Sequence, residues 1–155
     1  MRKNFKIVDS YFKTTAGILG LVGKGKITLM QNVYSNAYLE SSAPYTSAGT
    51  AEVGGFLGVL QAIDANTVTA FNNCWFDGEV RLHGEYARYA GGIAGTSMQG
   101  TIEYIHCLNT GKVSNERTTA GQFIGGIVGS DQNGNQNILI EDCINIGEIS
   151  ASDAI

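Results

Sequence analysis

Proline and charged side chains are scarce in this chain. One proline in 155 residues argues against a disordered linker rich in proline and glycine. Only 15% of the residues are charged, and the net charge of −4 disfavours a nucleic-acid partner or an anionic membrane, because either needs a basic face. The surface is therefore expected to be rich in neutral polar side chains, which suit carbohydrate contact, lateral packing or a plain stalk.

Long apolar runs and helical periodicity are missing as well. Apolar runs such as residues 123–124 and 127–128 are too short to cross a bilayer, so we expect no membrane insertion. No segment keeps an apolar period of 3.6 residues for three turns, and helix is not expected. Residues 2–6 imitate the basic start of a signal peptide, but the next stretch contains Asp9 and Lys13 and no apolar core, so no signal peptide is expected.

Motifs for catalysis or metal binding are not found either. The chain has no His-Glu-x-x-His zinc motif and no Cys-x-x-Cys spacing. Residues 131–135 match a calcium loop only in composition, because the closing glutamate of such loops is absent. The acidic residues are scattered, which disfavours paired carboxylates for acid–base catalysis. We therefore expect no enzyme activity, no cofactor and no metal.

A glycine-rich segment, Gly-Gly-x-x-Gly, occurs four times, with Ala in place of the first glycine in the first copy. The copies lie at residues 16–20, 54–58, 91–95 and 125–129, so their last glycines are 38, 37 and 34 residues apart. Those glycines are Gly20, Gly58, Gly95 and Gly129. A repeat of this length indicates a stack of similar units that bury a continuous core only together. We expect each copy to form a corner and the first strand of its unit, where glycine permits close backbone approach.

A second set of positions repeats in step with the glycines. The anchor position holds Val33, Cys74, Cys107 and Cys143. Apolar residues three before and six after the anchor, with a glycine four after it in three copies, predict about three short strands per repeat. The fold expected is an all-β parallel solenoid of about four coils of 34–38 residues. The three cysteines should point inward as reduced core thiols; a disulfide or a metal site is less favoured.

The repeat resembles the GLUG-type repeat of bacterial surface proteins, which also occurs in the stalks of immunoglobulin-A peptidases. The likeness rests on Gly-Gly-Ile-Val-Gly followed by Ile-x-x-Cys-x-Asn-x-Gly-x-Val/Ile-Ser, and residues 91–114 and 125–150 match best. Almost the whole chain is covered, although the first copy has Val33 and Ala37 in place of Cys and Gly. The resemblance implies a right-handed β-solenoid in an extracellular or cell-surface protein. It implies no activity.

The repeats divide the single array into five parts. They are a partial repeat at 1–15, then repeats at 16–53, 54–90, 91–124 and 125–155. The partial repeat rests on a match of residues 7–10 to residues 140–143.

Several side chains are candidates for structural ladders or for ligand contact. Asn109 shares a repeat position with Asn145, and Asn32 shares another with Asn73 and Asp142, so stacked amides should bond along the axis. A column of Glu79, Lys112 and Glu148, with Tyr38 in the first copy, indicates cross-strand charge pairing. His83 and His106 occupy different columns and are expected on the surface or in a ladder.

The aromatic residues are the main candidates for recognition. Tyr45, Tyr86 and Tyr89 lie in variable arms, which in solenoids often carry the binding surface. Tyr34 and Trp75 share a column with Leu108 and Ile144, which favours a second apolar packing seam over sugar stacking.

Three functions follow as expectations. The first is a non-enzymatic stalk or adhesive scaffold, with a host glycan or protein as partner. The second is a filament of copies stacked end to end through open strand edges. The third is a carbohydrate-binding solenoid.

Overall fold

The computed structural model describes residues 6–9, 14–25, 29–42, 51–62, 66–84, 87–98, 100–116, 123–131 and 136–152. These residues form strands and no helix, which confirms the all-β class. Every strand pairing among them is parallel. The strands form five sheets, and neighbours in each sheet come from successive repeats.

Three of the sheets form the outside of the molecule. The upper wall consists of β4 (Leu29–Gln31), β9 (Val68–Asn72), β14 (Gly100–Ile105) and β19 (Gln136–Glu141). The outer wall consists of β5 (Tyr34–Ser35), β10 (Trp75–Phe76), β15 (Leu108–Asn109) and β20 (Ile144–Asn145). The lower wall consists of β1 (Lys6–Asp9), β6 (Tyr38–Ser42), β11 (Glu79–His83), β16 (Lys112–Glu116) and β21 (Ile149–Ala151).

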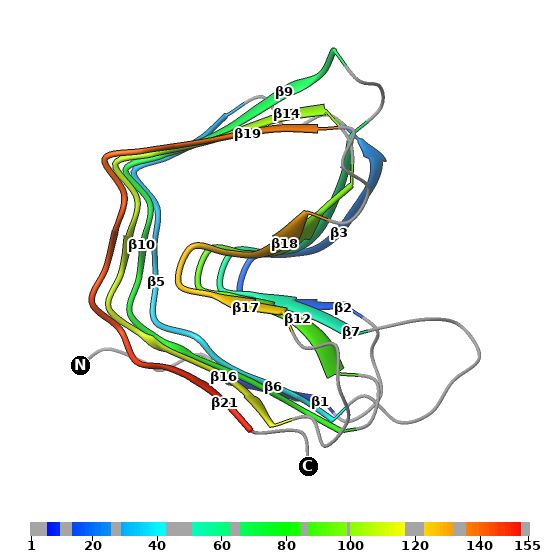
Figure 1. Ribbon diagram of the computed structural model, residues 1–155, viewed down its shortest axis with the longest axis vertical. Coiled ribbons are helices and arrows are strands. Elements are labelled where there is room, and N and C mark those ends of the chain that lie inside the picture. Colours follow the sequence, from blue (N-terminus) through cyan, green and yellow to red (C-terminus); the bar gives the residue numbers. More distant parts are fainter. Residues whose placement is uncertain are drawn as a thin grey trace.

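The other two sheets form an inner layer that we call the tongue. One face is β2 (Thr14–Ala16), β7 (Ala51–Gly54), β12 (Ala87–Gly91) and β17 (Phe123–Gly125). The other is β3 (Leu19–Gly25), β8 (Leu57–Ala62), β13 (Ala94–Ser97) and β18 (Val128–Asp131). Seen along the stack, the walls enclose the tongue on three sides, and its bend points at the outer wall (Figure 1).

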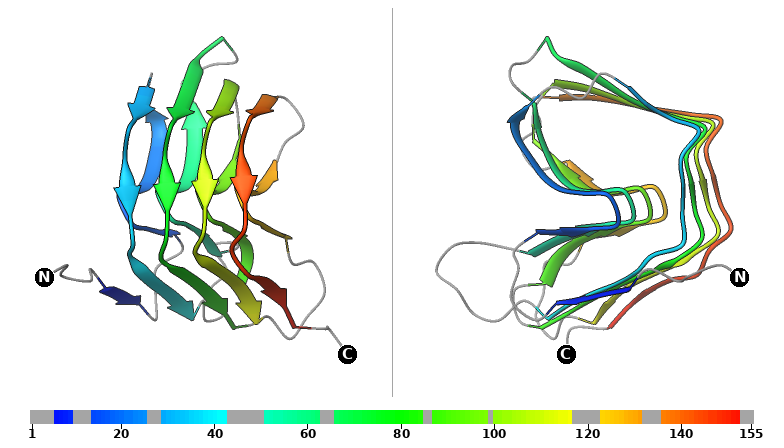
Figure 2. Two further views of the ribbon diagram at one scale, coloured as in Figure 1. Left: turned by 90° about the vertical axis from the view of Figure 1, so that its left-hand side faces the viewer. Right: turned by 180° about the vertical axis from the view of Figure 1, so that it is seen from behind.

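The side view shows equivalent strands stacked in sequence order (Figure 2). This parallel arrangement is consistent with a β-solenoid. The prediction of three strands per repeat is wrong, because each repeat contributes five. The Gly-Gly-x-x-Gly segment joins two tongue strands through a tight bend, where a single strand was expected.

The position of β1 also corrects the sequence alignment. Ile7 pairs with Leu39 in the lower wall. Leu39 is followed in that column by Val80, Val113 and Ile149. The N-terminal segment therefore corresponds to the last strand of a repeat. Its proposed match to residues 140–143, which begin at the end of the upper wall, is wrong. Both places accept an apolar residue at the first of these positions, and four residues are too few to distinguish them.

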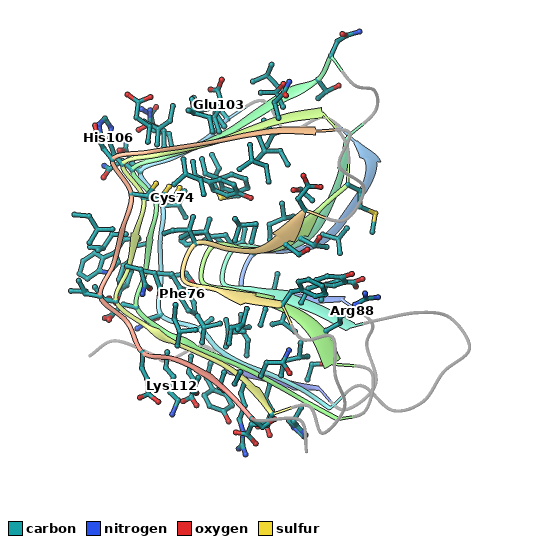
Figure 3. The ribbon with its side chains drawn as sticks, in the orientation of Figure 1. Cys74, Phe76, Arg88, Glu103, His106 and Lys112 are labelled. Carbon is teal, nitrogen blue, oxygen red and sulfur yellow. The ribbon has the colours of Figure 1, made fainter. Side chains whose placement is uncertain are left out.

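The core lies on both sides of the tongue (Figure 3). Against the upper wall, the rings of Phe71 and Tyr104 stack at 5.4 Å between centroids, and both residues are fully buried. Against the lower wall, Val80 and Val113 form a column of buried side chains. Because each inward side chain lies over its equivalent in the next repeat, the core is continuous along the stack.

The bend of the tongue needs glycine for close backbone approach. A Cβ at Gly92 would collide with the carbonyl oxygen of Gly126 and lie 2.7 Å from Cγ of Asn109. A Cβ at Gly95 would lie 2.6 Å from the carbonyl oxygen of Gly58, and Gly129 is equally confined, 2.5 Å from the carbonyl oxygen of Gly95. Side chains at these positions would therefore separate successive repeats.

The corner between the upper and outer walls uses a different device. Asn32, Asn73, His106 and Asp142 have φ values of 56°, 50°, 51° and 48°. Asn, Asp and His adopt this left-handed conformation more readily than other residues with a side chain. The left-handed backbone at this corner is therefore the first reason for the polar column before the cysteines. The sequence pattern indicated only the hydrogen bonds between these side chains.

Candidate functional site

The outer wall carries an exposed aromatic pair. Its strands are only two residues long, and strand alternation turns the first residue outward and the second inward. Trp75 is 39% exposed, whereas its neighbour Phe76 is fully buried. Tyr34 pairs with Trp75 in register and is also 39% exposed. The column that the sequence favoured as a packing seam therefore faces solvent.

The column continues beyond the aromatic pair. Leu108 and Ile144 follow Trp75 in register, and Ile144 is 56% exposed. Exposed apolar side chains gathered in one column differ from the isolated ones on an ordinary surface. We take this face as the candidate site.

A chain of polar contacts holds the two aromatic side chains. The Tyr34 hydroxyl donates to Oδ2 of Asp77 at 3.3 Å, and the Thr110 hydroxyl donates to Oδ1 of Asp77 at 2.6 Å. The indole Nε1 of Trp75 donates to Oγ1 of Thr110 at 2.8 Å. The rings are 4.8 Å apart between centroids and inclined by 64°. Side chains from three repeats thus surround one exposed carboxylate.

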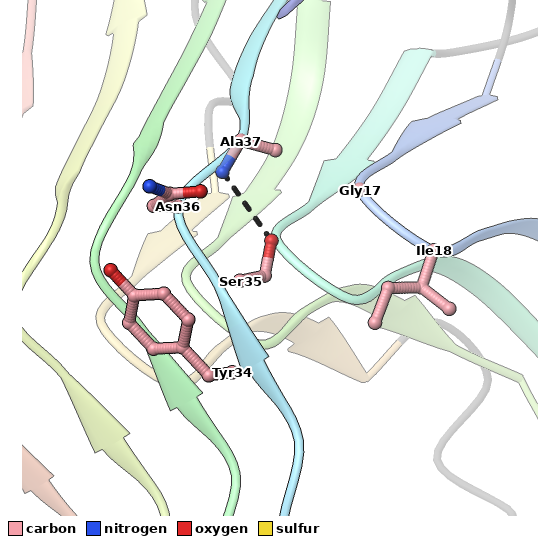
Figure 4. A pocket seen from close by; sticks show the side chains of 6 residues that line it. All are labelled: Gly17, Ile18, Tyr34, Ser35, Asn36 and Ala37. Carbon is pink, nitrogen blue, oxygen red and sulfur yellow. Dashed lines mark hydrogen bonds between the residues drawn. The ribbon is translucent and has the colours of Figure 1, made fainter. Parts of the chain in front are cut away.

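A hollow of about 340 Å³ lies beside Tyr34 at the start of the stack (Figure 4). Gly17 and Ile18 line it from the bend of the tongue. Tyr34, Ser35, Asn36 and Ala37 line it from the wall. Tyr34 therefore belongs both to the hollow and to the exposed column.

Stacked side chains form hydrogen bonds along the axis, as expected. Inside the outer wall, Nδ2 of Asn109 donates to Oδ1 of Asn145 at 2.7 Å. At the left-handed corner, Nδ2 of Asn73 donates to Oδ1 of Asn32 at 2.7 Å. Asn109 is fully buried, so its amide needs a partner, and the next repeat supplies it.

The cysteine column lies on the inner side of the corner (Figure 3). Cys74 and Cys107 are buried, and Cys143 is partly buried. The thiol of Cys107 donates to the carbonyl of Phe71 at 3.4 Å, and that of Cys143 donates to the carbonyl of Tyr104 at 3.2 Å. The hydrogen bond with Cys74 and burial raise the pKa of Cys107, and burial raises the pKa of Cys143. Neutral thiols bonded to carbonyls act as core side chains.

The lower wall presents charges outward. Arg81 forms a bidentate salt bridge with Glu116, in which both N–O distances are 3.0 Å. Its Nη1 also lies 3.8 Å from Oε1 of Glu40. The same Glu40 is 3.2 Å from Nε2 of His83. The Arg81 guanidinium lowers the pKa of Glu116. Arg81 therefore forms ion pairs with the strands on both sides of its own.

The charged column that the sequence singled out also lies on this wall. Lys112 pairs in register with Glu79 and lies 3.1 Å from Glu148, as the alternation of charge indicated. His83 lies on this wall and His106 at the upper corner, so they form no pair, also as expected.

Tyr89 does not present a free ring. It is 4% exposed and stacks on Phe123 with centroids 5.3 Å apart, and the Arg88 guanidinium lies 5.2 Å from its ring centroid. Tyr89 is therefore a packing residue of the tongue, contrary to the expectation of ligand contact. Tyr45 and Tyr86 lie outside the described residues.

Comparisons with known proteins found no match to a family model, to a curated protein or to a solved structure. Within the described ranges, no group of three His, Cys, Asp or Glu side chains could hold a metal ion. A helix long and apolar enough to span a membrane is likewise not found among those residues.

Proposed function

We propose that this chain is a non-enzymatic structural and adhesive repeat segment of a cell-surface protein, and that it acts as a stalk or interaction scaffold. We further propose a right-handed solenoid with about four coils of 34–38 residues. The observation that carries the proposal is the pairing of each strand with its equivalents in the adjacent repeats. Such a chain grows along one axis as repeats are added, which is what a stalk requires.

Two further observations support a scaffold. Polar side chains that are used elsewhere for chemistry are tied into ladders here, as Asn109 with Asn145 and Arg81 with Glu116. The pKa of Cys107 and of Cys143 is raised, and Cys74, whose pKa is lowered by its hydrogen bond with Cys107, is fully buried. Neither arrangement suits nucleophilic catalysis, which needs an accessible thiolate.

Surface labelling tests this proposal. An antibody against the purified chain should label intact cells of the source organism without permeabilisation. Labelling that requires permeabilisation would contradict a cell-surface scaffold. Turnover of any glycan or peptide by the purified chain, in a broad substrate screen, would contradict the non-enzymatic role.

A further inference from the structure

The aromatic pair of the outer wall links neighbouring repeats through Tyr34–Asp77 and Trp75–Thr110, but a plain stalk does not need its exposed rings. We propose that Tyr34, Trp75 and Asp77 form a binding site for the neutral sugar rings of a glycan. This inference goes beyond the scaffold role, because a stalk without a ligand site would still hold its repeats together.

The two rings supply a prepared apolar surface. Each is 39% exposed, and the residue after Trp75, Phe76, is fully buried. Trp75 is held through its Nε1 bond to Thr110, and Tyr34 through its hydroxyl bond to Asp77. Aromatic side chains bind with little loss of conformational entropy, and fixed ones lose even less. The carbon–hydrogen faces of a sugar ring match such a surface, whereas its hydroxyl groups need polar partners at the edge.

Asp77 supplies those polar partners. A carboxylate offers about four acceptor positions, and the bonds from Thr110 and Tyr34 use one on each oxygen. Asp77 is exposed, so sugar hydroxyl groups can reach the remaining positions and donate to them. Asn36 lies next to Tyr34 and adds an amide that can both donate and accept (Figure 4).

The charge of the site selects among glycans. Among the described residues, no lysine, arginine or histidine forms an ion pair with Asp77. The chain as a whole carries a net charge of −4. An acidic sugar would place its carboxylate against an uncompensated negative charge, which opposes binding. A neutral sugar avoids this repulsion and can donate to the carboxylate.

Intrinsic fluorescence gives a direct assay, because Trp75 is the only tryptophan of the chain. The intact chain is titrated with cellohexaose, chitohexaose and mannohexaose as neutral probes and with hexagalacturonate as the acidic one. We expect a saturable change of tryptophan emission with at least one neutral probe, the same affinity by calorimetry, and no binding of hexagalacturonate. Asp77→Asn should weaken binding about tenfold, since a hydrogen bond to a charged group is lost.

Two further variants complete the test by calorimetry, with circular dichroism to verify folding. Trp75→Ala should abolish binding by removing the platform. Leu139→Ala, which shortens a 44% exposed side chain of the upper wall, should leave binding unchanged. The proposal is overturned if no neutral probe binds at millimolar concentration, if the acidic probe binds best, or if Asp77→Asn and Trp75→Ala bind as tightly as the wild type.

Discussion

Substitution of a core residue usually destabilises a protein, but at Tyr104 we predict a substitution that stabilises it. Its ring is fully buried, and its hydroxyl has no hydrogen-bond partner among the described residues. A buried hydroxyl without a partner costs about 1–3 kcal/mol. Phenylalanine already occupies the equivalent position of the preceding repeat, at Phe71, where it stacks on Tyr104. Tyr104→Phe should therefore stabilise the chain.

The size of the gain follows from two opposing effects. Removing the hydroxyl relieves the desolvation cost of about 1–3 kcal/mol. The oxygen also makes several van der Waals contacts at about 0.1–0.2 kcal/mol each, so their loss costs about 0.5–1 kcal/mol. The net gain is about 1 kcal/mol, which corresponds to a rise of about 2–4 °C in melting temperature for a chain of this size.

Thermal unfolding followed by circular dichroism, together with urea unfolding followed by the emission of Trp75, measures the effect. The reverse substitution, Phe71→Tyr, is the matched control and should lower the melting temperature, because it places a second hydroxyl in the same core. A melting temperature of Tyr104→Phe below that of the wild type would refute the reasoning, since it would mean that the hydroxyl is satisfied.

Three other predictions follow from the tongue, the lower wall and the cysteine column. Gly92→Val should lower the unfolding free energy by at least about 3 kcal/mol, because a side chain there meets the backbone of the next bend; wild-type melting would contradict the close approach. The lowered pKa of Glu116 means that its pairing with Arg81 stabilises the chain above the ordinary carboxyl pKa, and this contribution is lost as the pH falls through the folded-state value. Arg81→Gln should therefore reduce the melting temperature at neutral pH and have a smaller effect once the pH falls below the folded-state pKa of Glu116, and an effect that grows in acid would argue against the pair. Iodoacetamide should label Cys107 only at the rate of unfolding, while the partly buried Cys143 reacts faster, as mass spectrometry of labelled peptides can show; equal rates at both thiols in the native chain would be inconsistent with the column.

The sequence predicts the repeat, the parallel strands and the ladders, because these depend on residues that recur at fixed spacing. Asn109 and Asn145 are an example, since their shared position was enough to predict the bond between them. The tongue could not be predicted in the same way. Its two strands are joined by a bend at Gly92, and in sequence such a bend cannot be distinguished from a corner between walls.

The sequence offered Tyr34 and Trp75 for sugar stacking but favoured a packing seam, because of a local ambiguity. Trp75 and Phe76 are both large and apolar, and the sequence does not say which one faces the core. The structure turns Phe76 inward, where it meets Phe56 of the tongue at 6.4 Å between ring centroids. Asp77 and Thr110 each lie two residues after a member of the column, Trp75 and Leu108. Polar residues at that spacing share a strand face with the column, so they could have indicated that the column faces solvent.

The fold depends most on the stacking of equivalent residues from successive repeats. Nuclear magnetic resonance can test this through scalar couplings across individual hydrogen bonds. The amide of Leu108 should couple to the carbonyl of Cys74, and the amide of Ile144 to the carbonyl of Cys107, since both pairs are bonded at 2.9 Å. Couplings between these residues would support the stack. Couplings of the same amides to carbonyls of their own repeat would contradict it.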